Sequence, residues 1–335
     1  MVLVKPVSVT VLTPATSANL GPGFDSLGLA LQLYNRFKVK LAQGDQQSPI
    51  IRIEGEYGTG LSTGPDNLLF RAFAALYARQ GVELPAIEIF MTIGIPHGCG
   101  LGSSATAVVG GLVAANALLG LQGKAVPEED LLEIAVENEA GNHPDNVAPA
   151  LLGGLVATTN IDGSIRAIKT RFPDALKAVI FTPSFPMDTI AGRKLLPNTY
   201  PKADVTFNTG RVALLLTALQ SGRYELIGDA MQDRLHQPYR QAIFPAMPDI
   251  IQAAIDAGAH GASLSGGGSS LIALASSNFT GILRAMQETA SANGIEGTGR
   301  ILRADQQGAR VLPVDGARRQ KQPNPNYRYH SNPMH

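Results

Sequence analysis

Hydrophobic and polar positions alternate over short stretches of the chain and recur at helical spacing over longer ones. Short alternation predicts strands, and helical spacing after a capping residue predicts helices. The expected strands are 7–11, 37–41, 50–54, 86–93, 155–159, 164–169, 178–181, 270–275, 300–304 and 309–312. The expected helices are 68–79, 103–119, 128–139, 205–220, 223–235, 249–257 and 279–293. Because strands and helices do not alternate regularly, the pattern favours an α+β fold over a doubly wound parallel sheet.

Composition narrows the class of protein. The 335 residues include 27 basic and 27 acidic side chains, so no basic surplus indicates a nucleic-acid partner. Cys99 is the only cysteine, which excludes an intramolecular disulfide and a cysteine metal cage. We see no leader pattern and no uninterrupted apolar run of spanning length. We therefore expect a cytoplasmic protein without a membrane or nucleic-acid partner.

The segment 96–105, P-H-G-C-G-L-G-S-S-A, is the strongest chemical signal in the chain. Three glycines within five residues let the backbone approach a ligand closely, and the segment leads into a predicted helix whose first amides lack partners. Such a helix start attracts anions, above all phosphates. No G-K-[ST] follows, so this is not a Walker A motif, and the spacing does not fit a dinucleotide-binding fold. A plain strand-to-helix turn capped by serines remains the alternative.

Two further segments combine glycine with small and polar residues. The segment 14–25, P-A-T-S-A-N-L-G-P-G-F-D, is expected to be a loop that presents Asn19 and Asp25 to a small polar ligand. The segment 261–270, G-A-S-L-S-G-G-G-S-S, indicates a strand packed against a neighbouring loop or a phosphate, or simply a tight hairpin. Taken alone, each is more typical of an ordinary structured turn than of a site.

Together, and in this order, the three segments resemble the motifs of the GHMP kinases. The pattern P-x-x-x-G-L-G-S-S-A of that family is matched at every defined position by Pro96 and by 100–105. The segments 14–25 and 143–150, H-P-D-N-V-A-P-A, are most similar to its homoserine kinase branch. The resemblance covers nearly the whole chain.

The resemblance implies a two-domain fold, with an N-terminal domain like ribosomal S5 domain 2 and a C-terminal ferredoxin-like α/β sandwich. We expect the ATP-binding domain at 1–160, the second domain at 161–315 and a polar tail at 316–335. The implied activity is transfer of the γ-phosphoryl of ATP to the hydroxyl of L-homoserine, giving O-phospho-L-homoserine for threonine biosynthesis. ATP and Mg²⁺ are the implied cofactors, and a homodimer is the expected assembly.

The resemblance also implies residue roles for the nucleotide and the metal. The implied nucleotide-binding residues are Asn67, Pro96, His97, Gly98, Cys99, Gly100, Leu101, Gly102, Ser103, Ser104, Ala105 and Thr106. The implied metal ligands are Ser104 and Glu139. Because extra residues separate Glu139 from His143 relative to the family pattern, Glu137 stays open as the alternative.

For the amino-acid substrate, the resemblance implies Asn19, Asp25, His143, Asp145, Thr189, Arg193 and Arg240. A zwitterion needs a carboxylate opposite its ammonium and guanidinium groups opposite its carboxylate, which suits Asp25 and the two arginines.

For catalysis, Asn146 is expected beside the reacting hydroxyl, with Ser103 and Ser104 stabilising the transition state. No lysine corresponds to the one used by mevalonate-type relatives, so we expect no strong general base. The sequence leaves open a GHMP kinase for mevalonate, a sugar or shikimate. It also leaves open a non-catalytic nucleotide-binding regulator with this fold.

Overall fold

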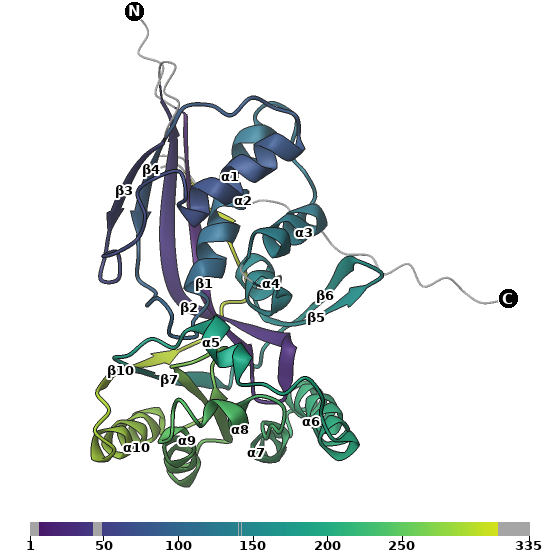
Figure 1. Cartoon of the computed structure of the whole chain (residues 1–335), viewed down its shortest axis with the longest axis vertical. Helices are drawn as coiled ribbons and strands as arrows, with labels where there is room; N and C mark the ends of the chain where they lie inside the picture. Colours follow the sequence, from purple (N-terminus) through teal and green to yellow (C-terminus); the bar gives the residue numbers. More distant parts are fainter. Residues whose placement is uncertain (1–6, 43–48, 140, 142, 314–335) are drawn as a thin grey trace, which may run out of the picture.

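The computed structural model of the chain describes residues 7–42, 49–139, 141 and 143–313. The predicted polar tail, 316–335, lies outside these residues. Two β-sheets with their covering helices follow one another along the long axis of the molecule (Figure 1). Among the described strands only β3 and β4 pair in parallel, and the remaining pairings are antiparallel. This arrangement confirms the α+β prediction.

The first sheet is built around one long hairpin, β1–β2. Its strands are β1 (Ser8–Asn19), β2 (Gly23–Leu41), β3 (Ile50–Glu54), β4 (Ile87–Thr92), β5 (Leu155–Ile161), β6 (Ser164–Thr170) and β11 (Arg310–Val311). The main order is β11-β1-β2-β4-β3, and β5 pairs with both β2 and β6. Because β2 is 19 residues long, its second half pairs with β4 while its first half pairs with β5. The hairpin therefore reaches from the core of this sheet toward the second sheet.

The segment 14–25, which we expected to be a loop, belongs mostly to this hairpin. β1 continues from Pro14 to Asn19 and β2 begins at Gly23, so only 20–22 form the turn. The residue types are those of turns, but an antiparallel partner satisfies their backbone whatever their local preference. Positive φ values of 71° at Asn19 and 86° at Gly21 close the turn.

Four helices cover one face of the first sheet: α1 (Leu68–Arg79), α2 (Ser103–Gly120), α3 (Glu128–Asn138) and α4 (Pro144–Leu152) (Figure 1). The first three agree with the sequence prediction. We did not predict α4, because its two prolines resemble a turn. Pro144 occupies the first helical turn, where a missing amide hydrogen costs nothing.

Among the described residues, α2 is the one helix long and apolar enough by composition to cross a membrane, yet 67% of it is buried inside the protein. It packs against α1 and β1. Its apolar character is therefore that of a core helix.

The second sheet has the order β10-β7-β9-β8. Its strands are β7 (Lys177–Pro183), β8 (Gly261–Leu264), β9 (Leu271–Ala275) and β10 (Gly297–Leu302). The helices of this half are α5 (Thr189–Lys194), α6 (Lys202–Ser221), α7 (Ile227–Ala230), α8 (Gln237–Arg240), α9 (Met247–Asp256) and α10 (Phe279–Ala292). The antiparallel pairing of β8 with β9 confirms the hairpin predicted around 266–268.

The single helix predicted for 223–235 is wrong. The chain instead forms a 3₁₀ turn, Tyr224–Leu226, followed by the short helix α7. The Asp233 carboxylate then accepts the backbone N–H groups of the next residues and starts α8 in a new direction. A side chain that captures backbone donors in this way competes with helix continuation.

Candidate active site

The loops of the two halves enclose a cavity of about 380 Å³. Predicted site residues that line it are Asn19, Asn67, His97, Gly98, Gly100, Leu101, Gly102, Ser103, Ser104, Glu139, His143, Asp145, Asn146, Thr189, Arg193 and Arg240. Asp25 does not line the cavity but bonds to Arg193, which does. Pro96, Cys99, Ala105 and Thr106 are buried outside the lining.

The three glycine-rich segments meet at this cavity and are fastened together. Ser265 Oγ donates to the carbonyl of Gly100 (2.7 Å), and the amide of Thr16 donates to the carbonyl of Leu101 (3.1 Å). The amide of Gly266 in turn donates to the carbonyl of Ala18 (3.0 Å). The segment 261–270 therefore packs its backbone against both other segments. This agrees with the interpretation from the sequence that the segment lies against a neighbouring loop.

The glycine-rich loop needs its glycines. Gly98, Gly100 and Gly102 have φ values of 62°, 75° and 67°. A Cβ atom on Gly100 would lie 2.1 Å from the carbonyl oxygen of Ser265, and one on Gly102 would lie 1.9 Å from Thr16 Oγ1. The loop delivers the chain to Ser103 at the start of α2, where the first amides have no acceptor within the helix. This is the geometry of an anion site.

Replacing Gly102 with alanine is expected to destabilise the protein and to weaken, by about tenfold or more, binding of the ATP that the sequence resemblance implies, because backbone strain and a steric clash act together. Gly123→Ala is the matched control, since Gly123 has a φ of 71° but nothing within 4 Å of an added Cβ. Strain alone costs about 1–2 kcal/mol there. Urea unfolding and ATP titrations measure both effects, and equal behaviour of the two variants would contradict this account of the loop.

Ser104 and Glu139 form an oxygen-rich pair beside the loop. Ser104 Oγ donates to Glu139 Oε1 (2.6 Å), while Glu139 Oε2 is buried without a partner. Burial raises the pKa of Glu139, and the Ser104 hydrogen bond partly offsets this. Glu137, the alternative metal ligand, instead pairs on the surface with Arg79 (3.0 Å). Hydroxyl and carboxylate oxygens suit Mg²⁺, whose remaining ligands are usually phosphates and water.

Ser103 is engaged within the loop. His97 Nε2 lies 3.0 Å from the carbonyl of Tyr57, and His97 Nδ1 lies 3.1 Å from Ser103 Oγ. A carbonyl oxygen can only accept, so Nε2 carries the proton and Nδ1 accepts from the hydroxyl. Burial lowers the pKa of His97, consistent with a neutral ring. The Ser103 hydroxyl thus stabilises the loop by its contact with His97. The Ser103 backbone amide is the first amide of α2.

Asp25 and Arg193 form a bidentate ion pair. Arg193 Nη1 and Nη2 lie 3.0 Å and 2.5 Å from the two carboxylate oxygens of Asp25. His143 Nδ1 is 3.6 Å from Asp25 Oδ2, and burial lowers the pKa of His143 although Asp25 opposes this. Asn19 Oδ1 accepts from the Asp25 backbone amide (3.1 Å) and so fixes the position of Asp25. Thr189 lies one turn before Arg193 on α5.

Asp145 is a buried carboxyl group at the N-terminus of α4. Its exposed fraction is 3%, and its Oδ1 has no hydrogen-bond partner. Burial, followed by the charge of Asp25, raises the pKa of Asp145 to about 7. A helix N-terminus normally lowers a carboxyl pKa, so the cost of desolvation outweighs the helix dipole here.

Asn146 and Asn67 each use side-chain atoms in hydrogen bonds within the protein. Asn146 Oδ1 accepts from Thr16 Oγ1 (2.8 Å), so its amide nitrogen is the group left to donate into the cavity. Asn67 caps α1, with Oδ1 accepting from the amide of Leu69 (3.0 Å) and Nδ2 donating to the carbonyl of Ser62 (2.7 Å). Asn67 therefore shapes the cavity wall.

Buried polar atoms without partners concentrate at the cavity. Of the seven among the described side chains, four belong to Glu139, Asp145, Arg193 and Arg240, which line it. Leaving such an atom unpaired costs about 1–3 kcal/mol. A polar, charged ligand would supply partners, so this clustering marks the cavity as a binding site.

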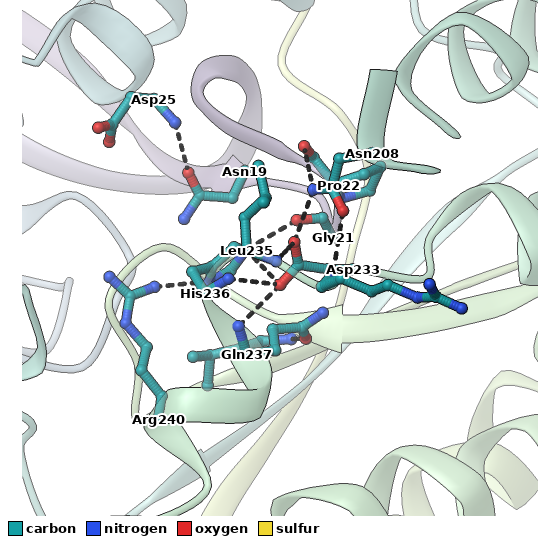
Figure 2. A network of polar contacts seen from close by, with 12 residues as sticks. Asn19, Gly21, Pro22, Asp25, Asn208, Asp233, Leu235, His236, Gln237 and Arg240 are labelled. Atoms are coloured by element: carbon teal, nitrogen blue, oxygen red, sulfur yellow. Dashed lines mark hydrogen bonds and ion pairs between the residues drawn. The ribbon is translucent and has the colours of Figure 1, made fainter. Parts of the chain in front are cut away.

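Sequence reasoning missed several residues of the site. Phe24 lies within the quoted segment 14–25, and its ring lies 5.1 Å and 5.7 Å from the guanidinium carbons of Arg193 and Arg240. His236 precedes Arg240 by one helical turn and accepts from it, which helical spacing could have indicated (Figure 2). Phe24 and His236 contact lining residues without lining the cavity themselves. The lining residues that were not predicted carry no sequence signal of a site: Asn35, Leu61, Ser62, Asp66, Leu68, Met91, Ile93 and Ala107.

Comparisons with known proteins identify the family of the chain. The family models described as GHMP kinases N terminal domain and GHMP kinases C terminal match residues 67–154 and 215–292. A homoserine kinase of Parasynechococcus marenigrum (strain WH8102) is 41% identical over 92% of this chain and 96% of its own length. Another, of Microchaete diplosiphon, is 43% identical over 91% and 97%. The crystal structure of homoserine kinase from Cytophaga hutchinsonii ATCC 33406 matches with a TM-score of 0.82 and 33% identity, over 91% of this chain and 97% of that one.

These matches extend across both sheets and the cavity between them, and they confirm the resemblance carried by the three motifs. The chain therefore belongs to the homoserine kinase branch of the GHMP kinase family.

Proposed function

We propose that this protein transfers the γ-phosphoryl group of ATP to the side-chain hydroxyl of L-homoserine, giving O-phospho-L-homoserine. The observation that carries the proposal is one cavity that joins a phosphate-binding loop to the Asp25–Arg193 pair and Arg240. Membership of the homoserine kinase branch supports the same activity. Such a kinase would act in threonine biosynthesis.

The nucleotide end of the cavity is the glycine-rich loop with the start of α2. The amides there would bind the phosphates, and Ser104 with Glu139 would hold Mg²⁺. When bound, Mg²⁺ supplies neutralisation of the charge that develops on the transferred phosphoryl group. Glu139 brings an unpaired carboxylate oxygen for this purpose, whereas Glu137 is already paired with Arg79 on the surface.

The other end of the cavity suits a zwitterion. A bound carboxylate would find the guanidinium groups of Arg193 and Arg240 in the cavity lining. A bound ammonium would find the carboxyl group of Asp145 there, together with the charge of Asp25, which pairs with the lining residue Arg193. Mevalonate, shikimate and galactose lack an ammonium, so they would leave the buried carboxyl of Asp145 without a counter-charge.

Catalysis would rest on positioning and charge stabilisation. Because Thr16 occupies Asn146 Oδ1, the amide nitrogen of Asn146 can donate to the reacting hydroxyl oxygen but cannot take its proton. The loop amides, together with Ser103 and Ser104, would stabilise the phosphoryl group in transit. This mechanism needs no strong general base.

A coupled assay of ADP release with homoserine, mevalonate, shikimate and galactose in parallel tests the proposal. Release with homoserine alone is the expected result. Release with another acceptor would assign a different GHMP kinase activity, and release with none would favour a nucleotide-binding regulator. Omission of Mg²⁺ tests the cofactor, and sedimentation analysis tests the proposed homodimer.

A further inference from the structure

Arg240 is a buried arginine without a direct carboxylate partner in the described part of the chain. Its exposed fraction is 1%. Arg240 Nη1 donates to His236 Nδ1 (2.7 Å) and to the carbonyl of Gly266 (3.2 Å), both of which are neutral acceptors. Arg193, by contrast, is neutralised by Asp25. The charges of Asp25, Asp233 and Asp145 act on the pKa of Arg240 without direct contact, and they partly offset its lowering by burial and by Arg193. A buried guanidinium is normally paired directly with a carboxylate, so the two neutral acceptors of Arg240 need an explanation.

The contacts of His236 fix its tautomer (Figure 2). A guanidinium can only donate, so His236 Nδ1 must accept from Arg240. The Gly21 carbonyl can only accept, so His236 Nε2, at 2.7 Å, must carry the proton. The ring is therefore neutral, and a second proton on Nδ1 would collide with the guanidinium. Burial acts in the same direction and lowers the pKa of His236 to about 4.

The nearest acid, Asp233, is occupied elsewhere. Its side chain is fully buried and accepts the backbone N–H groups of Leu235 (2.9 Å), His236 (3.0 Å) and Gln237 (2.7 Å). It also accepts from Asn208 Nδ2 (2.7 Å). Asp233 Oδ2 also lies 3.5 Å from His236 Nε2, and its charge opposes the lowering of the His236 pKa by burial without overcoming it. The four donors fix the backbone of His236 and the start of α8, and Asp233 forms no hydrogen bond or ion pair with Arg240.

The ring of Phe24 packs against both His236 and Arg240. The rings of Phe24 and His236 stack with centroids 5.2 Å apart and an interplanar angle of 23°. The guanidinium carbon of Arg240 lies 5.7 Å from the centroid of the same ring. The imidazole is therefore fixed in position as well as in protonation, and the direction of the Arg240 fork is set by it.

We propose that Asp233 and His236 are positioning residues that aim Arg240 at the carboxylate of the amino-acid substrate while leaving its positive charge free. A neutral nitrogen orients the guanidinium as well as a carboxylate would, but it does not compete with the substrate for the charge. Arg193 lines the same cavity, but its charge is already paired with Asp25. This inference rests on the proposed homoserine kinase function and assigns to Arg240 the main share of carboxylate recognition.

Two substitutions of His236 separate its two hydrogen bonds. His236→Asn places an amide oxygen near the position of Nδ1, so it keeps the acceptor for Arg240 and loses the donor to Gly21. His236→Gln places an amide nitrogen near the position of Nε2, so it keeps the donor to Gly21 and loses the acceptor for Arg240. We expect the Gln variant to raise the KM for homoserine by about tenfold or more, because a hydrogen bond to a charged group is lost. The Asn variant should stay much closer to the unmutated enzyme.

Three comparisons test whether His236 acts through Arg240. The KM for ATP should not change in either variant. The preference for homoserine over homoserine amide, which lacks the carboxylate charge, should fall in the Gln variant. In the Arg240→Lys background, His236→Gln should cause little further loss, since coupled residues are not additive. Equal effects of Asn and Gln, or an undiminished effect in that background, would overturn the proposal.

The unmutated protein gives a second readout that does not depend on whether a variant folds. After the ring signals are assigned to individual histidines, imidazole nitrogen NMR should show the His236 ring protonated on Nε2 and neutral down to about pH 5, above its pKa of about 4. A His236 ring protonated on Nδ1, or one that titrates near pH 6.5, would overturn the inference. Failure of the unmutated protein to phosphorylate homoserine would instead reject the proposed function itself, so the two failures are distinguishable.

Discussion

Replacing Glu139 with glutamine is expected to lower kcat by about 100-fold, which corresponds to about 3 kcal/mol of transition-state stabilisation. Glu139 receives the Ser104 hydroxyl at 2.6 Å and keeps its second carboxylate oxygen buried and unpaired. Glutamine preserves the size of the side chain and an oxygen for Ser104, but it removes the negative charge that would hold Mg²⁺. Stability should not fall, because burial already disfavours the charged form of Glu139.

The control for this prediction is the same substitution two residues earlier. Glu137 forms a solvent-exposed ion pair with Arg79, and such pairs contribute about 0–1 kcal/mol. Glu137→Gln should therefore leave kcat unchanged. Calorimetric titration of ATP with and without Mg²⁺ adds a readout besides activity, since Glu139→Gln should abolish most of the gain in affinity that Mg²⁺ confers. A loss of kcat in the Glu137 variant instead would move the metal site to the alternative that the sequence left open.

Local signals explain what the sequence predicted well. The glycines of the 96–105 loop need positive φ values that side chains resist, and the small, apolar residues after Ser103 allow a helix to be buried on nearly all sides. Both properties belong to the residues themselves, so they are visible without the fold. The capping of α1 by Asn67 is equally local.

Long-range partners explain what the sequence did not predict. The strand character of 14–19 depends on pairing with β2, which overrides the turn preference of those residues. The role of His236 depends on the carbonyl of Gly21, which lies 215 positions away in the chain. Resemblance to the family indicated Arg240, but only the folded arrangement shows that a neutral ring, and not a carboxylate, holds it.

Replacing Asp145 with asparagine is expected to stabilise the protein above pH 7. The pKa of Asp145 is raised from 3.8 to about 7, so between these values the folded state binds more protons than the unfolded state. Stability contributed by this group therefore falls as pH rises through that window, and the loss is complete above pH 7. The difference corresponds to at most about 4 kcal/mol. The variant should match the unmutated protein near pH 4 and exceed it at pH 8.

Urea unfolding at pH 4 and pH 8 measures this difference. Asp162→Asn is the control, because Asp162 is exposed in the turn between β5 and β6 and already has the positive φ of 51° that asparagine tolerates. It should change stability little at either pH. Equal stability of the Asp145 variant and the unmutated protein at pH 8 would show that the carboxyl is not strained by burial.

The same substitution decides whether Asp145 binds the substrate or takes its proton. If Asp145 faces the ammonium of homoserine, the variant should raise the KM for homoserine by about tenfold or more while kcat at saturation largely survives. Binding should then release a proton near pH 7 from the unmutated enzyme, because a nearby cation favours the carboxylate form, and the variant should lose this release. Calorimetry in buffers of different ionisation enthalpy detects it. Abolished kcat with unchanged homoserine affinity would instead make Asp145 the general base, since a pKa of about 7 is suited to that role at neutral pH.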